Sequence, residues 1–145
     1  MSTTREAAAI AGVKYETLRN WLKRGLLDHA QPETRGWRRY TTADYCALLL
    51  MTEGLAAGIS VETMIDVCRD QEVGRVFERL VNEEWSPSQS RPHHVLIWST
   101  LPEALFMLAP LHAIPHELAA NPAPVTIFDL TAIHAEAEDR ITARA

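Results

Sequence analysis

The most informative stretch of the chain reads GVKYETLRNWLKRGLL and covers residues 12–27. An alanine-rich helix is predicted before it, with Thr4 as its N-cap, and Gly12 is expected to end that helix. A second helix is predicted over about 15–24, and Gly25 is expected to end it. Two helices joined by so short a connection are typical of a helix-turn-helix.

The second predicted helix is amphipathic. At about 100° per residue, Leu18, Trp21 and Leu22 fall on one face and are expected to pack inward. The opposite face collects polar side chains that can reach base edges and phosphates of DNA. These side chains are Glu16, Arg19, Asn20 and Lys23. An ordinary solvated surface helix has a similar polar face, so this feature alone leaves both interpretations open.

A basic and aromatic segment follows this helix. Residues 28–36 are polar, contain Pro32 and Gly36, and are predicted to form a loop. Residues 37–40 alternate aromatic and basic side chains, which favours a short exposed strand. This segment contributes Arg35, Trp37, Arg38, Arg39 and Tyr40. Such a composition suits a β-wing that lies over phosphates or enters the minor groove.

The charge of the chain is unevenly distributed. The net charge is −5, yet residues 1–40 hold eight basic and four acidic side chains. Residues 70–145 hold five basic and eleven acidic side chains. A basic N-terminal part on an acidic body fits a protein that presents one face to a polyanion.

Two more helical segments are predicted before a linker. Thr42 is expected to cap a helix over about 43–57, which Gly58 ends. Ser60 is expected to cap the next segment, whose apolar side chains repeat every 3.6 residues or so. That pattern fits either one long helix or two helices joined near residues 69–71. Residues 86–92 have the composition of a linker.

The remaining segment, residues 93–145, is predicted to alternate strands and helices. The strands are expected at 95–98 and 125–128. A capping box of Thr100 and Glu103 predicts a helix that Pro110 ends, and Asp129 is expected to cap a last helix. Pro115 is expected to open a short helical turn.

The predicted fold class is α+β, mainly α: an N-terminal winged helix-turn-helix followed by a small strand-helix-strand-helix tail domain. The predicted domains are residues 1–70 (DNA-binding), 71–85 (connecting helix), 86–92 (linker) and 93–145 (a small α/β dimerisation or effector domain). Two apolar stripes are candidate dimer interfaces, and the one in the tail is favoured. Packing into the core of its own subunit is an equal alternative for the tail stripe. The stripes are Val73, Val76, Phe77, Leu80 and Val81 in the connecting helix, and Leu130, Ile133, Ala137 and Ile141 in the tail.

No catalytic residues, cofactor or metal site are predicted. Cys46 and Cys68 lie inside apolar helical patterns and are expected to be small buried hydrophobic residues. Four histidines are expected to be ordinary surface side chains, because Pro115 interrupts the one pair with i, i+4 spacing. These histidines are His93, His94, His112 and His116.

Residues 4–70 resemble the DNA-binding domain of MerR-type regulators. GVKYETLRNWL (12–22) is similar to that family's Gly-Val-Ser-x-Arg-Thr-Leu-Arg-Tyr-Tyr-Glu run, and GLL (25–27) matches its Gly-Leu-Leu. GWRRY (36–40) resembles the family's Gly-Tyr-Arg-Arg-Tyr wing, and GISVE (58–62) resembles a turn between its third and fourth helices. The family usually has arginine where this chain has Glu16, and tyrosine where it has Asn20. Glu16 is suited either to accepting from cytosine N4 or to capping the helix N-terminus.

This resemblance implies a sequence-specific transcriptional regulator that acts as a homodimer in the cytoplasm, on the nucleoid. The expected partners are double-stranded DNA, a second copy of the chain, and RNA polymerase or another regulator, with no membrane contact. The predicted DNA-binding residues are Lys14, Tyr15, Glu16, Arg19, Asn20, Lys23, Arg24, Arg35, Trp37, Arg38, Arg39 and Tyr40. One alternative is a phage-type excisionase or another DNA-bending accessory protein. Another is a protein-interaction adaptor with a winged-helix fold.

Overall fold

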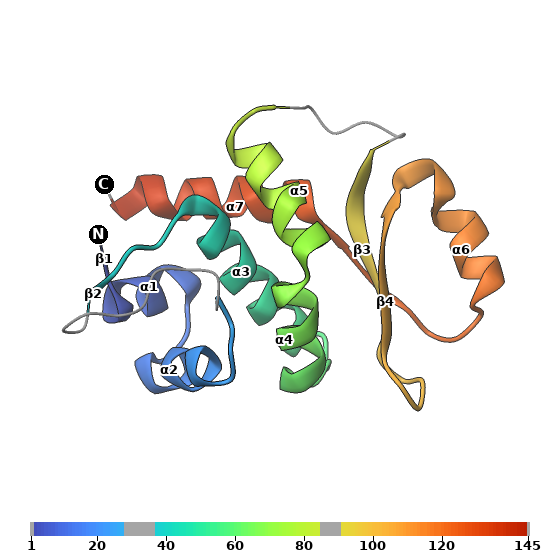
Figure 1. Cartoon of the computed structure of the whole chain (residues 1–145), viewed down its shortest axis with the longest axis horizontal. Coiled ribbons are helices and arrows are strands. Elements are labelled where there is room, and N and C mark those ends of the chain that lie inside the picture. The colour runs from blue at the N-terminus through green and yellow to red at the C-terminus, as the bar shows by residue number, and fades with distance from the viewer. Residues whose placement is uncertain (1, 28–36, 85–90, 145) are drawn as a thin grey trace.

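The computed structural model describes residues 2–27, 37–84 and 91–144. The protein is mainly helical and contains a small three-stranded sheet. Figure 1 shows three layers: a group of helices, which we call the head, then the sheet, then the helix α6. The head consists of α1 (Thr4–Ala11), α2 (Tyr15–Lys23), α3 (Thr42–Ala56), α4 (Val61–Arg69) and α5 (Gln71–Val81). None of the described helices is both long enough and apolar enough to cross a lipid bilayer.

The first two helices are set by caps that lie close to the predicted positions. Thr3, one residue before the predicted cap, accepts a hydrogen bond from the Glu6 amide at 3.1 Å and completes a capping box. Gly12 ends α1 in the left-handed conformation, with φ of 76°. Leu18 and Trp21 of α2 are buried, as its amphipathic pattern predicts. The helix-turn-helix is therefore formed by the predicted pair of helices.

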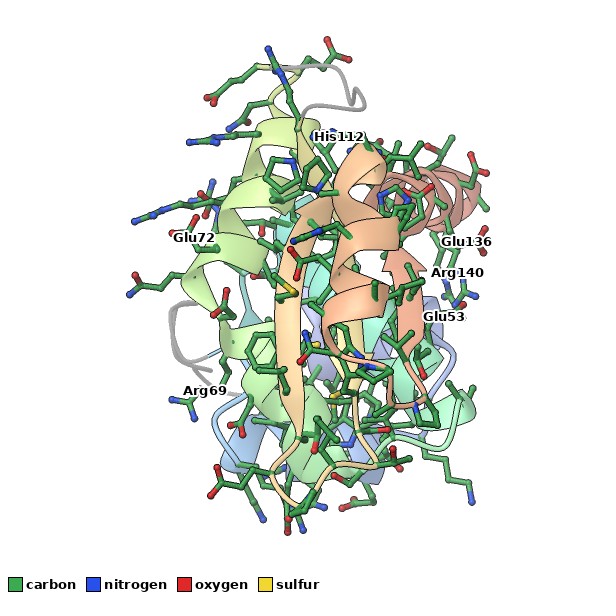
Figure 2. The ribbon with its side chains drawn as sticks, turned by 90° about the vertical axis from the view of Figure 1, so that its right-hand side faces the viewer. Glu53, Arg69, Glu72, His112, Glu136 and Arg140 are labelled. Carbon is green, nitrogen blue, oxygen red and sulfur yellow. The ribbon has the colours of Figure 1, made fainter. Side chains whose placement is uncertain are left out.

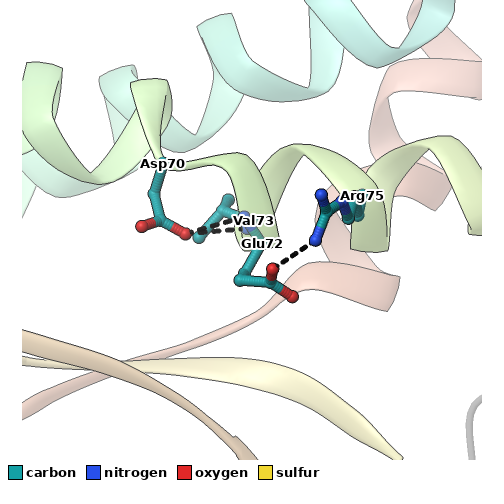
Figure 3. A network of polar contacts seen from close by, with 4 residues as sticks. All are labelled: Asp70, Glu72, Val73 and Arg75. Atoms are coloured by element: carbon teal, nitrogen blue, oxygen red, sulfur yellow. Dashed lines mark hydrogen bonds and ion pairs between the residues drawn. The ribbon is translucent and has the colours of Figure 1, made fainter.

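The long apolar pattern after Ser60 forms two helices. Asp70 has an extended conformation and separates α4 from α5. Its carboxylate accepts hydrogen bonds from the amides of Glu72 and Val73 at 2.9 and 3.1 Å, and so caps α5 (Figure 3). Glu72 also pairs with Arg75 at 2.5 Å on the exposed side. Of the two alternatives, the structure confirms the pair of helices.

The antiparallel sheet has the strand order β4-β3-β5. Its strands are β3 (Pro92–Trp98), β4 (Leu105–Pro110) and β5 (Thr126–Asp129), and the 3-10 helix η1 (Leu111–Ala113) and α6 (Ile114–Ala120) connect β4 to β5. One sheet face packs on the head, and α6 covers the other (Figure 1). Asp129 ends β5 and caps α7 (Leu130–Arg144), as predicted.

The predicted helix between Thr100 and Pro110 is wrong, because residues 105–110 form β4. The apolar run Leu-Phe-Met-Leu within this segment suits a helix or a strand equally well by pattern. β3 is buried from His93 to Trp98. A buried strand needs partners for its backbone N–H and C=O groups on both sides. β4 supplies them along one side, where Trp98 pairs with Leu105 and Val95 with Leu108.

The sheet and the last helix share one core with the head. Val95 and Ile97 of β3 and Ile133 of α7 belong to the same buried cluster as the leucines of α3. Figure 1 shows α7 running back from the sheet across the head, so that both chain ends lie on one side. The domain boundaries remain predictions, and the predicted linker largely falls on residues 85–90, outside the described residues. On the other face of the sheet, Leu96, Trp98, Ala109 and Ile114 form a second, smaller buried cluster within the tail.

The two apolar stripes that are candidate dimer interfaces pack within the chain's own core. The buried members of both stripes are Val73, Val76, Phe77, Leu80, Leu130, Ile133 and Ala137. They contact residues of the same chain, because each helix needs its apolar face covered within the subunit. Neither stripe is therefore exposed to a second copy. Cys46 and Cys68 are buried free thiols, as predicted.

Arg140 joins the last helix to the helix-turn-helix. Its guanidinium donates a hydrogen bond to the Ile10 carbonyl in the last turn of α1, at 3.0 Å. It also pairs with Glu136 at 2.8 Å. Arg140, Glu136 and Glu53 line a cleft of about 320 Å³ between α3 and α7, on the side labelled in Figure 2. A cation at this position is favourable, since the carbonyl end of a helix carries partial negative charge.

Candidate nucleic-acid interface

α2 presents a continuous polar surface at the edge of the head. Figure 1 shows this helix beside α1 and far from the three-stranded sheet. The predicted polar residues of its outer face are exposed, and so are the flanking cations. The exposed residues are Lys14, Glu16, Arg19, Asn20, Lys23 and Arg24. Burial of Leu18 and Trp21 fixes which face turns outward.

Two arginines surround the ring of Tyr15 at the start of α2. The Arg19 guanidinium donates a hydrogen bond to the Tyr15 hydroxyl at 3.1 Å and lies 5.7 Å from the ring centroid. The Arg5 guanidinium, from the first turn of α1, lies 4.1 Å from the same centroid. Cation–π contact holds both cations near one half-buried ring. The arrangement concentrates positive charge where α1 and α2 meet, which favours an anionic partner.

The N-terminus of α2 lies in the same region. Lys14 occupies the N-cap position, and its side chain makes no capping hydrogen bond. Backbone N–H groups in the first turn of a helix are suitable donors to a phosphate oxygen. The start of α2 therefore places backbone N–H donors and cationic side chains next to each other, as binding of a phosphate requires.

The segment predicted to form a wing is described only in part. Ser2 and Thr3 form β1 and pair antiparallel with Arg38 and Trp37 of β2 (Trp37–Arg38). Arg35 and the side chains of Trp37 and Arg38 lie outside what the structure describes. Arg39 is exposed.

Tyr40 is turned toward the head. Its hydroxyl lies 3.1 Å from Thr4 Oγ1 of α1, and its ring lies 5.9 Å from the Tyr45 ring of α3. The side chain is half-buried. These contacts give Tyr40 a packing role, which the alternating pattern of residues 37–40 did not predict.

The comparison with protein families gives one result for this region. Residues 2–71 match the model described as MerR HTH family regulatory protein. This region, just under half of the chain, is therefore similar to the helix-turn-helix of MerR-type regulators. The match confirms the resemblance found in the sequence and supports a DNA-binding transcriptional regulator. The comparison with curated proteins found no match.

Arg5 lies within the matched residues but is not among the predicted DNA-binding residues. It is one of the eight basic side chains of residues 1–40. Its position over Tyr15 depends on how α1 crosses α2, which short-range sequence patterns do not specify. The cluster therefore combines Tyr15 and Arg19, which the sequence predicts to bind DNA, with Arg5, which only the structure places beside them.

The expectation that His93, His94, His112 and His116 lie on the surface is wrong for the first two. His93 and His94 are only 7% and 9% exposed, because β3 is the central strand of the sheet. His112 and His116 are exposed, as predicted. Burial lowers the pKa of His94, and His93 adds to that effect, while the Asp129 carboxylate opposes it.

Proposed function

We propose that this protein is a sequence-specific DNA-binding transcription regulator that acts as a homodimer on chromosomal DNA in the cytoplasm. The exposed polar face of α2, with the two arginines around Tyr15, is the observation that carries this proposal. Such a face has the side chains that read base edges in the major groove. The family match of residues 2–71 supports the same conclusion.

We assign different roles to different parts of this surface. Arg19, Asn20 and Lys23 project from α2 and read bases, with Glu16 accepting from a cytosine amino group. Arg5 and Lys14, at the junction of α1 and α2, contact phosphates and set the orientation of the helix. Arg39 extends the phosphate contacts, together with the other basic residues of the predicted wing.

The homodimer follows from the small size of one helix-turn-helix. A single head covers few base pairs, whereas two heads about one DNA turn apart reach the specificity a regulator needs. We place the contact between copies at β4, an edge strand of the sheet. Leu105 of β4 is 41% exposed. Antiparallel pairing of two β4 edges satisfies their backbone groups symmetrically. Contacts with RNA polymerase or another regulator remain predictions.

Equilibrium binding to DNA tests the function. Duplexes selected from a random pool are titrated with the full chain at several salt concentrations. We expect log affinity to fall linearly with log salt, with a slope of about −0.9 for each phosphate contacted. Arg39→Ala should reduce that slope by about one contact on every sequence. If the affinity changes neither with salt concentration nor with Arg39→Ala, the result would instead favour a protein-interaction adaptor.

A further inference from the structure

Three side chains of metal-ligand type gather at one end of the sheet. They are His93 and His94 of β3 and Asp129 of β5. One donor atom of each lies within 4.8 Å of the other two. Within the described part of the chain, this is the one cluster of histidine, cysteine and carboxylate side chains close enough to share a metal ion.

A backbone irregularity brings the two histidines together. Neighbouring residues of a regular strand point to opposite faces, so adjacent histidines would normally be separated by the sheet. The register of β3 against β4 shifts between Pro92 and His94, as in a β-bulge. The two imidazole rings consequently lie 4.4 Å apart, centroid to centroid. Bulges commonly redirect side chains in this way next to functional sites.

Asp129 is held in place facing His94. The two residues are direct cross-strand partners in the pairing of β3 with β5. One carboxylate oxygen, Oδ1, accepts hydrogen bonds from the amides of Thr131 and Ala132 at 2.9 and 3.4 Å. The other oxygen, Oδ2, lies 3.9 Å from Nε2 of His94. Capping of α7 therefore leaves one oxygen available to a ligand.

His93 is oriented by a hydrogen bond from the far side of its ring. Its Nδ1 lies 2.8 Å from the Arg91 carbonyl oxygen. Because a carbonyl only accepts, Nδ1 carries the proton and Nε2 keeps its lone pair. A backbone carbonyl that fixes the tautomer in this way is typical of histidines that bind metal ions.

His94 is buried without the hydrogen bonds expected of a structural histidine. Its Nδ1 has no hydrogen-bond partner among the described residues. The 3.9 Å from its Nε2 to Asp129 exceeds hydrogen-bond distance. A buried polar group without a partner costs free energy, so the arrangement calls for a further ligand.

We propose that His93, His94 and Asp129 bind one divalent transition-metal ion of the zinc type. Imidazole nitrogens and a carboxylate oxygen are ligands that Zn²⁺ accepts at roughly 2.0–2.2 Å, and three protein ligands leave one position for water or an external ligand. Donor atoms around a tetrahedral ion are about 3.3 Å apart, so small side-chain rotations complete the site. This inference does not depend on the proposed function, because none of the three residues belongs to α1 or α2.

Direct metal-binding measurements test the site. The full chain, prepared without a histidine tag and stripped of metal, is dialysed against Zn²⁺ and its bound metal is measured. We expect one Zn²⁺ per chain at micromolar concentrations. In a parallel titration, Co²⁺ should give the visible absorption bands of a four-coordinate ion.

Three variants locate the binding. Asp129→Asn removes the charged ligand and keeps an efficient N-cap for α7, so the fold is preserved. Asp129→Asn and His94→Ala should each weaken Zn²⁺ binding at least roughly tenfold, by analogy with the losses seen at metal sites. His116→Ala, an exposed histidine of α6 outside the cluster, should bind like the unchanged chain.

The result that overturns the proposal is equally direct. The absence of stoichiometric Zn²⁺ binding by the unchanged chain contradicts it, and so does undiminished binding by Asp129→Asn. Circular dichroism shows whether each variant is folded. If His94→Ala fails to fold, Asp129→Asn alone decides the outcome.

Discussion

α2 and the beginning of β3 both concentrate polar side chains, but they place them in opposite environments. Arg19 and Asn20 of α2 are exposed, whereas His93 and His94 of β3 are buried. An exposed polar side chain stays hydrated, so it costs folding little and remains available to a large partner. A buried one costs free energy unless a partner enters with it. The first environment suits DNA, and the second suits a ligand as small as a metal ion.

The two regions should therefore respond differently to substitution. α2 lies at the edge of the head, so changes on its outer face should alter binding and leave stability unchanged. β3 and α7 share the core with the head, so changes there should alter the stability of the whole chain. Three substitutions and one thiol reaction test this difference. They are given from the largest expected effect to the smallest.

Ile133→Ala should have the largest effect. Ile133 is buried in α7 and belongs to the core shared with α3. We expect a loss of about 2–5 kcal/mol in the free energy of unfolding, because a buried isoleucine leaves a cavity. Urea unfolding followed by circular dichroism measures it, with the exposed Thr142→Ala on the same helix as the control. Two separate transitions, with the head unaffected, would contradict a shared core.

Arg19→Ala should act on DNA binding alone. We expect a loss of about 1–3 kcal/mol on the preferred site, with relaxed preference at one base pair and an unchanged unfolding midpoint. Fluorescence anisotropy with matched and single-base-changed duplexes measures both quantities. Arg144→Ala, an exposed arginine at the end of α7, is the matched control. If the variant keeps its full base preference, another residue performs the readout.

Arg140→Ala tests the link between the last helix and α1 of the head. It removes the hydrogen bond to the Ile10 carbonyl and the ion pair with Glu136. The side chain is partly exposed, so we expect a loss of only about 1 kcal/mol in the free energy of unfolding. Glu136→Gln removes the ion pair alone and should cost less. Equal losses in the two variants would show that the bond to α1 contributes nothing.

The smallest effect concerns the two thiols. Burial raises the pKa of Cys46 to about 12, with smaller contributions from Glu138 and Asp44, and burial also raises the pKa of Cys68. Because the thiolate is the reactive form, neither thiol should react with an aromatic disulfide reagent at pH 8 in the folded chain. Both should react in urea. Rapid reaction without denaturant would show that this part of the core opens readily.

The sequence predicts the local features of the head well and the pairing of the tail poorly. Gly12 and the spacing of Leu18 and Trp21 act within a few residues, so the two helices and the buried face of α2 could be predicted. The strand β4 could not be predicted, because its apolar run has no periodicity that distinguishes a strand from a helix. Its conformation depends on pairing with β3, which is a long-range contact.

The same distinction applies to the functional residues. The exposed residues of α2 follow from helical periodicity alone. Arg5 meets Tyr15 only after α1 and α2 have packed. His93 and His94 meet Asp129 only after a register shift that no local pattern specifies. Sites assembled across elements are therefore the ones that sequence patterns miss.

Genome-wide mapping of bound DNA tests the central claim most directly. The full chain and a variant with Arg5→Ala and Arg19→Ala are expressed at equal levels, and the DNA bound to each is sequenced. We predict that the unchanged chain occupies discrete sites that share a two-fold symmetric motif and lie at promoters, and that the variant loses them. Binding only at recombination attachment sites would identify a DNA-bending accessory protein instead. An absence of enriched sites, or identical occupancy by the variant, would contradict the assignment of α2 as the reading helix.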